Sequence, residues 1–104
     1  MGATDTTAVR LQVSVEEIDR SSIHLFEAEL AEAVRHHRGD ASLVVDLGAV
    51  RFLDSSGIRA LIDAERAVAQ TGGRLNVVGA TGIVRRVLEV AGVWEHFAAV
   101  STAA

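Results

Sequence analysis

The sequence predicts an α/β domain with a single mixed or parallel β-sheet of about four strands and three or four helices, largely in β-α-β-α-β-α order. The spacing of apolar residues alternates along the chain between steps of two, typical of strands, and steps of three and four, typical of helices. Two short apolar runs have the composition of strands buried on both faces of a parallel sheet. The chain has 104 residues, 49% of them hydrophobic, which is enough for one core and one domain.

Four segments have the character of strands. Residues 9–15 alternate apolar and polar side chains, as expected of a strand with one face in water. Residues 43–46 and 75–78 are the two apolar runs, and we expect both inside the sheet. Residues 97–100 are short and apolar, and we expect a last edge strand there.

Helices are expected over residues 23–34, 58–68 and 83–91, because apolar residues recur there in steps of three and four. Ser21 or Ser22 can cap the first helix, and glycine follows the end of each helix. The apolar residues expected on the inner face of the third helix are Ile83, Val84, Val87, Leu88 and Ala91.

The domain is expected to span residues 8–100. Residues 1–7 and 101–104 are small and polar, and we expect them to be flexible ends. The sequence has no cationic start followed by an apolar run, so we expect a cytoplasmic protein without a signal peptide.

Composition excludes several classes of function. The chain has no Cys, which excludes disulfides, thiolate metal sites and a cysteine nucleophile. It has no Lys, which excludes a Walker-type phosphate loop and lysine catalysis. Its net charge is −4, and it lacks the clustered cations of a nucleic-acid-binding surface.

One loop interrupts the regular alternation. After the strand that ends near Leu47, ten residues pass before helical spacing starts at Ile58. Three large apolar residues in this loop, Val50, Phe52 and Leu53, are expected to anchor it to the core. The loop ends in Asp54-Ser55-Ser56-Gly57 at a helix start beyond the carboxyl edge of the sheet, where α/β domains usually bind ligands and partners.

Two interpretations of these four residues stay open. As a helix cap, one Asp or Ser accepts a hydrogen bond from a free backbone N–H and stabilises the helix by about 1 kcal/mol. A single cap does not explain two adjacent hydroxyls followed by Gly. As a phosphorylation site, a Ser at a helix N-terminus would place the phosphate where backbone N–H groups and the helix dipole favour an anion. A partner that docks on the neutral hydroxyl would then be repelled by a phosphate of about −1.5 to −2 charges.

Several segments together carry a family resemblance: Val44-Val45-Asp46-Leu47, Phe52-Leu53-Asp54-Ser55-Ser56-Gly57-Ile58, Gly72-Gly73-Arg74-Leu75, and Val84-Arg85-Arg86-Val87-Leu88. They resemble the signature of STAS-domain anti-sigma factor antagonists. Glu17-Ile18-Asp19 is similar to the Glu-Leu-Asp entry of that family into its first helix. The resemblance covers most of the chain and implies a STAS-like fold.

The resemblance also implies a cycle of protein binding in which this chain is not an enzyme. In that family, the first Ser of the block is phosphorylated by a partner that is both a serine kinase and an anti-sigma factor. The unphosphorylated form binds this kinase and releases the sigma factor, and a serine phosphatase restores it. Carried over, Ser55 is the phosphoacceptor, Ser56 shapes the loop, and Gly57 lets a partner approach the backbone. Asp54 and Asp19 would flank the contact surface.

The sequence departs from the family at two places. Arg59 stands where a small residue is common, which puts a bulky cation beside the docking face. Too few residues precede Glu17 for the usual two strands, so an open sheet edge could pair with another copy in a homodimer. An alternative function is a constitutive STAS subunit or scaffold, for example bound to the ATPase of a lipid-transport complex or within a stress-sensing assembly. There Ser55 would contact the partner without being modified.

Other constellations do not support catalysis. The histidines lack the spacing of a metal site: His24, His36, His37 and His96. Ser55 lies in no Gly-x-Ser-x-Gly elbow. A phosphoaspartate receiver is rejected because the chain has no Lys and because Asp46 and Asp54 lie at opposite ends of an apolar loop. We expect a structural hydrogen-bonding role for Asp46, and no metal or cofactor.

Overall fold

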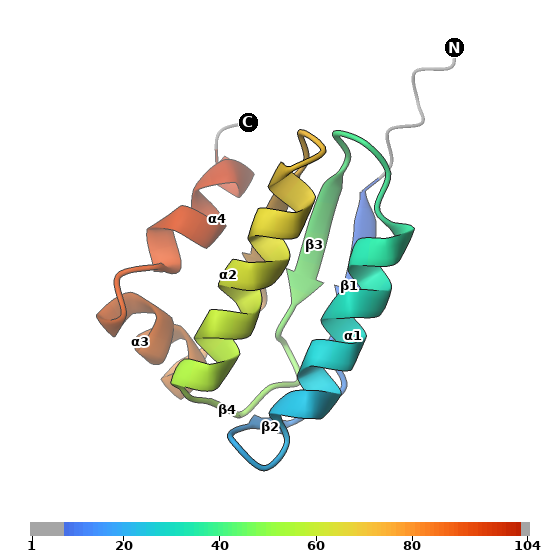
Figure 1. Cartoon of the computed structure of the whole chain (residues 1–104). Coiled ribbons are helices and arrows are strands. Elements are labelled where there is room, and N and C mark those ends of the chain that lie inside the picture. Colours follow the sequence, from blue (N-terminus) through green and yellow to red (C-terminus); the bar gives the residue numbers. More distant parts are fainter. Residues whose placement is uncertain (1–7, 103–104) are drawn as a thin grey trace.

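The computed structural model describes residues 8–102, and the expectations for residues 1–7, 103 and 104 lie outside this range. Strands and helices follow one another along the chain (Figure 1). Their bounds are β1 Val9–Gln12, β2 Glu17–Ile18, α1 Ile23–His36, β3 Ser42–Asp46, β4 Phe52–Leu53, α2 Ser55–Ala69, β5 Arg74–Val78, α3 Gly82–Val90 and α4 Trp94–Thr102.

The main sheet has three parallel strands in the order β1-β3-β5. Its register pairs Leu11 with Val45 and Val45 with Val77. Alternate residues of the central strand, Leu43 and Val45, are fully buried, because side chains on one face of a strand recur with a period of two. The predicted α/β class and the positions of these three strands are confirmed.

A second, two-stranded parallel sheet pairs β2 with β4. Ile18 lies opposite Leu53, and both side chains are fully buried. The predicted anchoring of this loop is therefore confirmed for Leu53 and also for Val50, which is buried. It is wrong for Phe52, which stays 38% exposed because the neighbouring residue in the strand takes the inward position.

Helices α1 and α2 lie side by side over one face of the main sheet, and both begin at the same end of the molecule (Figure 1). Helix α4 packs against β5. Phe26 of α1, Leu61 of α2 and Phe97 of α4 are fully buried and join these layers into one core. In the described part of the chain, no helix has the length and apolar character needed to cross a membrane.

The predicted edge strand at residues 97–100 is wrong, because these residues belong to α4. The backbone N–H of Phe97 donates to the Val93 carbonyl at 3.1 Å, as in a helical turn. A short apolar run has the same composition in a buried helix as in a buried strand, and only the tertiary packing distinguishes them.

Helix α2 begins at Ser55, three residues before the predicted start. The expected inner face of α3 is also partly wrong. Val84 and Leu88 are buried, but Ile83 is 53% exposed and Ala91 is exposed. Positions 84 and 88 lie one turn apart on one side of the helix, whereas Ile83 is rotated by about 100° from that side.

Candidate functional site

The pairing of β2 with β4 brings together two acidic residues from distant parts of the sequence. Asp19 directly follows β2 and Asp54 directly follows β4. The backbone N–H of Asp54 donates to the Ile18 carbonyl at 3.1 Å, which continues the ladder beyond both strands. Asp19 and Asp54 therefore occupy neighbouring positions at the carboxyl end of this small sheet, and their contact with a partner stays a prediction.

Asp54 is the N-cap of α2. Its backbone is extended, and its Oδ1 accepts a hydrogen bond from the Ser56 backbone N–H at 2.9 Å. The Ser56 hydroxyl donates to the same oxygen at 2.5 Å. The capping interpretation is thus correct for Asp54, and the hydroxyl of Ser56 is used inside the cap.

Ser55 is the first residue of α2, and it is exposed. Its hydroxyl makes no hydrogen bond to any residue that the structure describes. The next backbone N–H groups of the helix are already bound by Asp54, that of Ser56 by its carboxylate and that of Gly57 by its carbonyl. Capping accounts for Asp54 and Ser56, and it leaves the Ser55 hydroxyl available to a partner.

Asp19 forms a similar turn in front of α1. Its Oδ1 accepts hydrogen bonds from the Ser21 hydroxyl at 2.7 Å and from the backbone N–H groups of Ser21 and Ser22. The hydrogen bonds from Ser21, that of the hydroxyl above all, lower the pKa of the Asp19 carboxyl below its usual value, because they stabilise the charged form. Ser22 is the N-cap residue of α1, but its hydroxyl accepts no hydrogen bond from the N–H groups of the helix. It donates instead to the Glu17 carbonyl.

The N-termini of three helices, α1, α2 and α3, lie at this end of the molecule (Figure 1). Helices α1 and α2 follow β2 and β4, which are paired in parallel, and α3 follows β5 of the main sheet. Helix N-termini carry partial positive charge and free N–H donors. An anion near the start of such a helix is generally favoured.

Three large apolar side chains on β4 and in the first turns of α1 and α3 are exposed, and the sequence did not predict their exposure. Phe52 is 38% exposed on β4, Leu25 is 51% exposed in the first turn of α1, and Ile83 is 53% exposed in the first turn of α3. An exposed apolar group with polar residues around it is typical of a protein-docking surface. We call Leu25, Phe52, Ser55 and Ile83 the docking face.

Arg59 lies one turn after Ser55 on the exposed side of α2. Both line a shallow depression of about 460 Å³ together with Ile58, Ile62 and Arg66. Within the described residues, Arg59 forms no ion pair. The position of Arg59 beside the expected contact surface is as the sequence predicted, and its contact with a partner stays a prediction.

Gly57 is buried against the small sheet. A Cβ atom at this position would lie 2.9 Å from Ile18 Cγ2 and 2.9 Å from Leu53 Cδ1, which is closer than side chains pack. The glycine therefore lets the first turn of α2 sit directly on β2 and β4. The family resemblance implied that Gly57 lets a partner approach the backbone. The structure gives a different reason for a glycine here, because its Cβ position points at the buried side chains of Ile18 and Leu53.

Asp46 has the structural role that the sequence predicted. Its carboxylate accepts a hydrogen bond from Arg10 at 2.6 Å and another from the Gly48 backbone N–H at 2.8 Å. Among the described residues, no group of three His, Asp or Glu side chains could hold a metal ion. His37 is buried at the end of α1, where its ring contacts the Ala41 carbonyl.

Comparisons with known proteins agree with this geometry. The sequence model of a family described as "Mlab, STAS domain" matches residues 3–98. A solved structure of the anti-sigma factor antagonist SpoIIAA in its unphosphorylated form superposes with a TM-score of 0.67. It is 19% identical in sequence, and the match covers 88% of this chain and 77% of that chain, so this likeness shows the fold alone. A search of curated protein sequences found no match.

Proposed function

This chain belongs to the STAS-domain family, and we propose that it is a cytoplasmic anti-sigma factor antagonist that a serine-kinase anti-sigma factor binds and phosphorylates at Ser55. In the unphosphorylated form it occupies the kinase and thereby releases a sigma factor. Phosphorylation ends the interaction, and a serine phosphatase restores it. The chain has no catalytic activity of its own in this cycle and needs no cofactor.

The observation that carries the proposal is the difference between two adjacent serines. The Ser56 hydroxyl is held by Asp54 at 2.5 Å, whereas Ser55 is exposed at the start of α2 with a free hydroxyl among the described residues. A kinase can reach Ser55 without opening the helix cap. The apolar side chains of the docking face supply the area that a protein partner would cover.

The effect of phosphorylation follows from local charge. A phosphate on Ser55 adds about −1.5 to −2 charges at pH 7. The helix N-terminus stabilises this anion within the folded chain. A partner packed against the docking face would have to bury the new charge next to the carboxylates of Asp54 and Asp19, at the cost of desolvation and like-charge repulsion. The domain stays folded and the complex dissociates.

The test is phosphorylation by the cognate serine kinase with ATP, followed by intact-mass measurement of parent and variants. We expect one added phosphoryl group on the parent, none on Ser55→Ala, and one on the matched control Ser56→Ala. Circular dichroism checks that both variants are folded. Full phosphorylation of Ser55→Ala, or loss of phosphorylation only in Ser56→Ala, would contradict the assignment.

A second candidate function is a constitutive STAS subunit that binds a partner such as an ATPase without modification of Ser55. The observation that favours it is the description of the matching family as Mlab and not as an antagonist of sigma regulation. Affinity purification from the host with Ser55→Asp separates the two functions. An ATPase that stays bound to Ser55→Asp supports the constitutive subunit, and loss of a kinase from Ser55→Asp supports the antagonist.

A further inference from the structure

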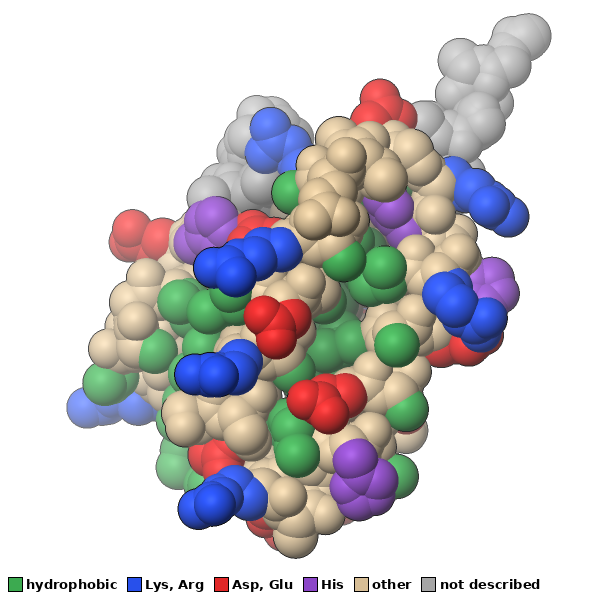
Figure 2. All heavy atoms as spheres, viewed as in Figure 1, with side chains coloured by type: hydrophobic (Ala, Val, Ile, Leu, Met, Phe, Trp, Pro, Cys, Tyr) green, Lys and Arg blue, Asp and Glu red, His purple; other side chains and the backbone are tan. Residues whose placement is uncertain are grey.

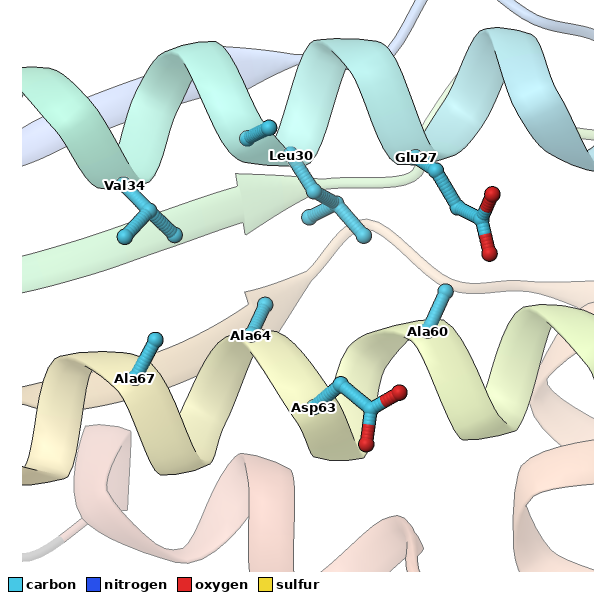
Figure 3. Close-up of a pocket in the computed structure, with 8 residues that line it drawn as sticks. Glu27, Leu30, Val34, Ala60, Asp63, Ala64 and Ala67 are labelled. Carbon is cyan, nitrogen blue, oxygen red and sulfur yellow. The ribbon is translucent and has the colours of Figure 1, made fainter.

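A shallow apolar groove runs between α1 and α2, outside the docking face. Its volume is about 330 Å³. Leu30 and Val34 of α1 face the alanine side chains of α2 across the gap (Figure 3). Leu30, Ala60 and Ala64 are almost fully buried and form the floor. The groove exists because alanines on α2 are too small to fill the space between two packed helices.

Two acidic side chains, Glu27 from α1 and Asp63 from α2, stand at this groove (Figure 3). Both are exposed, and neither forms an ion pair with a described residue. In the space-filling view, apolar surface fills the hollow between the two helices and acidic groups stand beside it (Figure 2). The groove therefore offers apolar contact together with unpaired negative charge. This combination disfavours a fatty acid or an anionic lipid and favours an apolar segment that carries a cation.

Helix α3 of the same chain presents the complementary surface. Ile83 is 53% exposed and Val90 is 77% exposed, the two highest values among the large apolar side chains of the described residues. Arg86 stands between them, exposed and without an ion pair in the described part of the chain. Positions 83, 86 and 90 are three and four residues apart, so these side chains form one ridge on one side of the helix.

We propose that the Ile83–Arg86–Val90 ridge of one copy docks into the α1–α2 groove of a second copy. The two apolar residues of the ridge cover the floor of the groove, and Arg86 lies against Glu27 and Asp63. A helix ridge that packs between two helices is the ordinary geometry of helix packing. The cation and the two acids lie on different surfaces of the chain, and Asp63 also borders the neighbouring depression that Arg59 and Arg66 line.

The open edge of β1 is a different surface from the groove and the ridge, and α1 contacts the chain just past it. The backbone N–H of Ser14, which continues this edge, is already bound by Glu29 of α1 at 3.1 Å. The Ser14 hydroxyl also donates to the Glu29 carboxylate. These contacts lie just past the strand, and pairing of the β1 edge with another copy stays a prediction.

The contact is heterologous, since ridge and groove are different surfaces, so a pair of copies keeps a free groove on one copy and a free ridge on the other. A single short helix covers less area than a standard stable interface, and the association is therefore weak and concentration-dependent. The docking face shares Ile83 with the ridge. Self-association therefore competes with binding of a partner at Ser55.

Sedimentation equilibrium over a concentration series of the full chain tests the proposal. We expect the parent to associate and both Arg86→Glu and Asp63→Arg to lose roughly tenfold in association constant, because each reverses a charge at the contact. Arg38→Glu and Asp40→Arg are matched controls, since both residues are exposed and lie in the α1–β3 loop, away from ridge and groove. The controls should associate like the parent.

Mixing the two variants gives the sharper result. Arg86→Glu keeps its groove and Asp63→Arg keeps its ridge, and the two reversed charges also attract each other across the second contact, so we expect the mixture to regain the association that each variant alone has lost. A parent that stays monomeric at every concentration overturns the proposal, as do variants that associate as strongly as the parent. Capture of another protein that depends on Glu27 and Asp63, with a monomeric parent, would assign the groove to that partner instead. Phosphorylation of Ser55 is not involved in these measurements, so they fail or succeed independently of the proposed function.

Discussion

Replacing Gly57 with Ala introduces a methyl group at the most tightly packed point below the site. Its Cβ would lie 2.9 Å from Ile18 Cγ2 and 2.9 Å from both Cγ and Cδ1 of Leu53. Ile18 and Leu53 are fully buried, so neither side chain can move into solvent to relieve the overlap. The first turn of α2 must therefore shift away from β2 and β4.

The magnitude combines two opposing effects. Overpacking a buried site costs about 1–3 kcal/mol, and the upper part of that range applies here because three contacts are too close at once. Alanine in place of glycine in a helix recovers roughly 0.5–1 kcal/mol. We expect a net loss of about 1–2 kcal/mol in the free energy of unfolding.

Urea denaturation monitored by circular dichroism measures this loss. The midpoint should fall while the slope of the unfolding free energy against urea concentration stays the same. In Leu53→Ala the lost side chain leaves a cavity, and the added methyl of Gly57→Ala would occupy part of it. We therefore expect the double variant to be more stable than the sum of the two single losses. A Gly57→Ala chain as stable as the parent, or strictly additive losses in the cycle, would refute the packing role of Gly57.

Three further predictions concern the same end of the molecule. Asp54→Ala should lower the free energy of unfolding by about 0.5–2 kcal/mol, whereas Asp54→Asn keeps a good N-cap and should lower it much less. Equal losses of unfolding free energy in the two variants, measured by thermal or urea unfolding, would contradict the cap. The pKa of Asp19 is lowered in the folded chain, so its contribution to stability is present above the unfolded pKa and is lost as the pH falls through the folded pKa. In Asp19→Asn the free energy of unfolding should therefore fall less on acidification than in the parent. An acid-unfolding curve equal to that of the parent would contradict this. Phe52→Ser should leave the free energy of unfolding within about 0.5 kcal/mol of the parent and weaken partner binding, because its ring is exposed on the docking face. Calorimetric titration that finds unchanged affinity would remove Phe52 from that face.

Periodicity predicted the elements with many regular repeats and missed those with few. Helix α1 and the strands at residues 42–46 and 74–78 have enough apolar residues at a fixed period to be recognised. Strands β2 and β4 have two residues each, too few for any period, and they exist because Ile18 and Leu53 pack against each other. Contacts of this kind join distant parts of the chain and leave no local pattern.

The residues of the site were easier to predict than their roles. The Asp-Ser-Ser-Gly block at a helix start indicated the site, and the structure brings Asp19 to it through the β2–β4 pairing. Spacing alone could not separate Ser56, whose hydroxyl is bound by Asp54, from Ser55, which is exposed, and only the family resemblance gave the two serines different roles. The sequence also could not show that Gly57 faces inward, because the contact involves side chains that are adjacent only in the folded chain.

The most direct test of the central claim is the affinity of the serine-kinase partner for this chain with and without phosphate on Ser55, measured by isothermal titration calorimetry. Circular dichroism of both forms under the same conditions reports the fold. We expect the phosphorylated chain to keep its helical signal and its melting temperature. We expect its affinity for the kinase to fall by roughly a hundredfold or more, because like charges opposed at an interface cost several kcal/mol. A phosphorylated chain that binds the kinase as tightly as the unmodified chain, or one that unfolds on phosphorylation, would contradict the central claim.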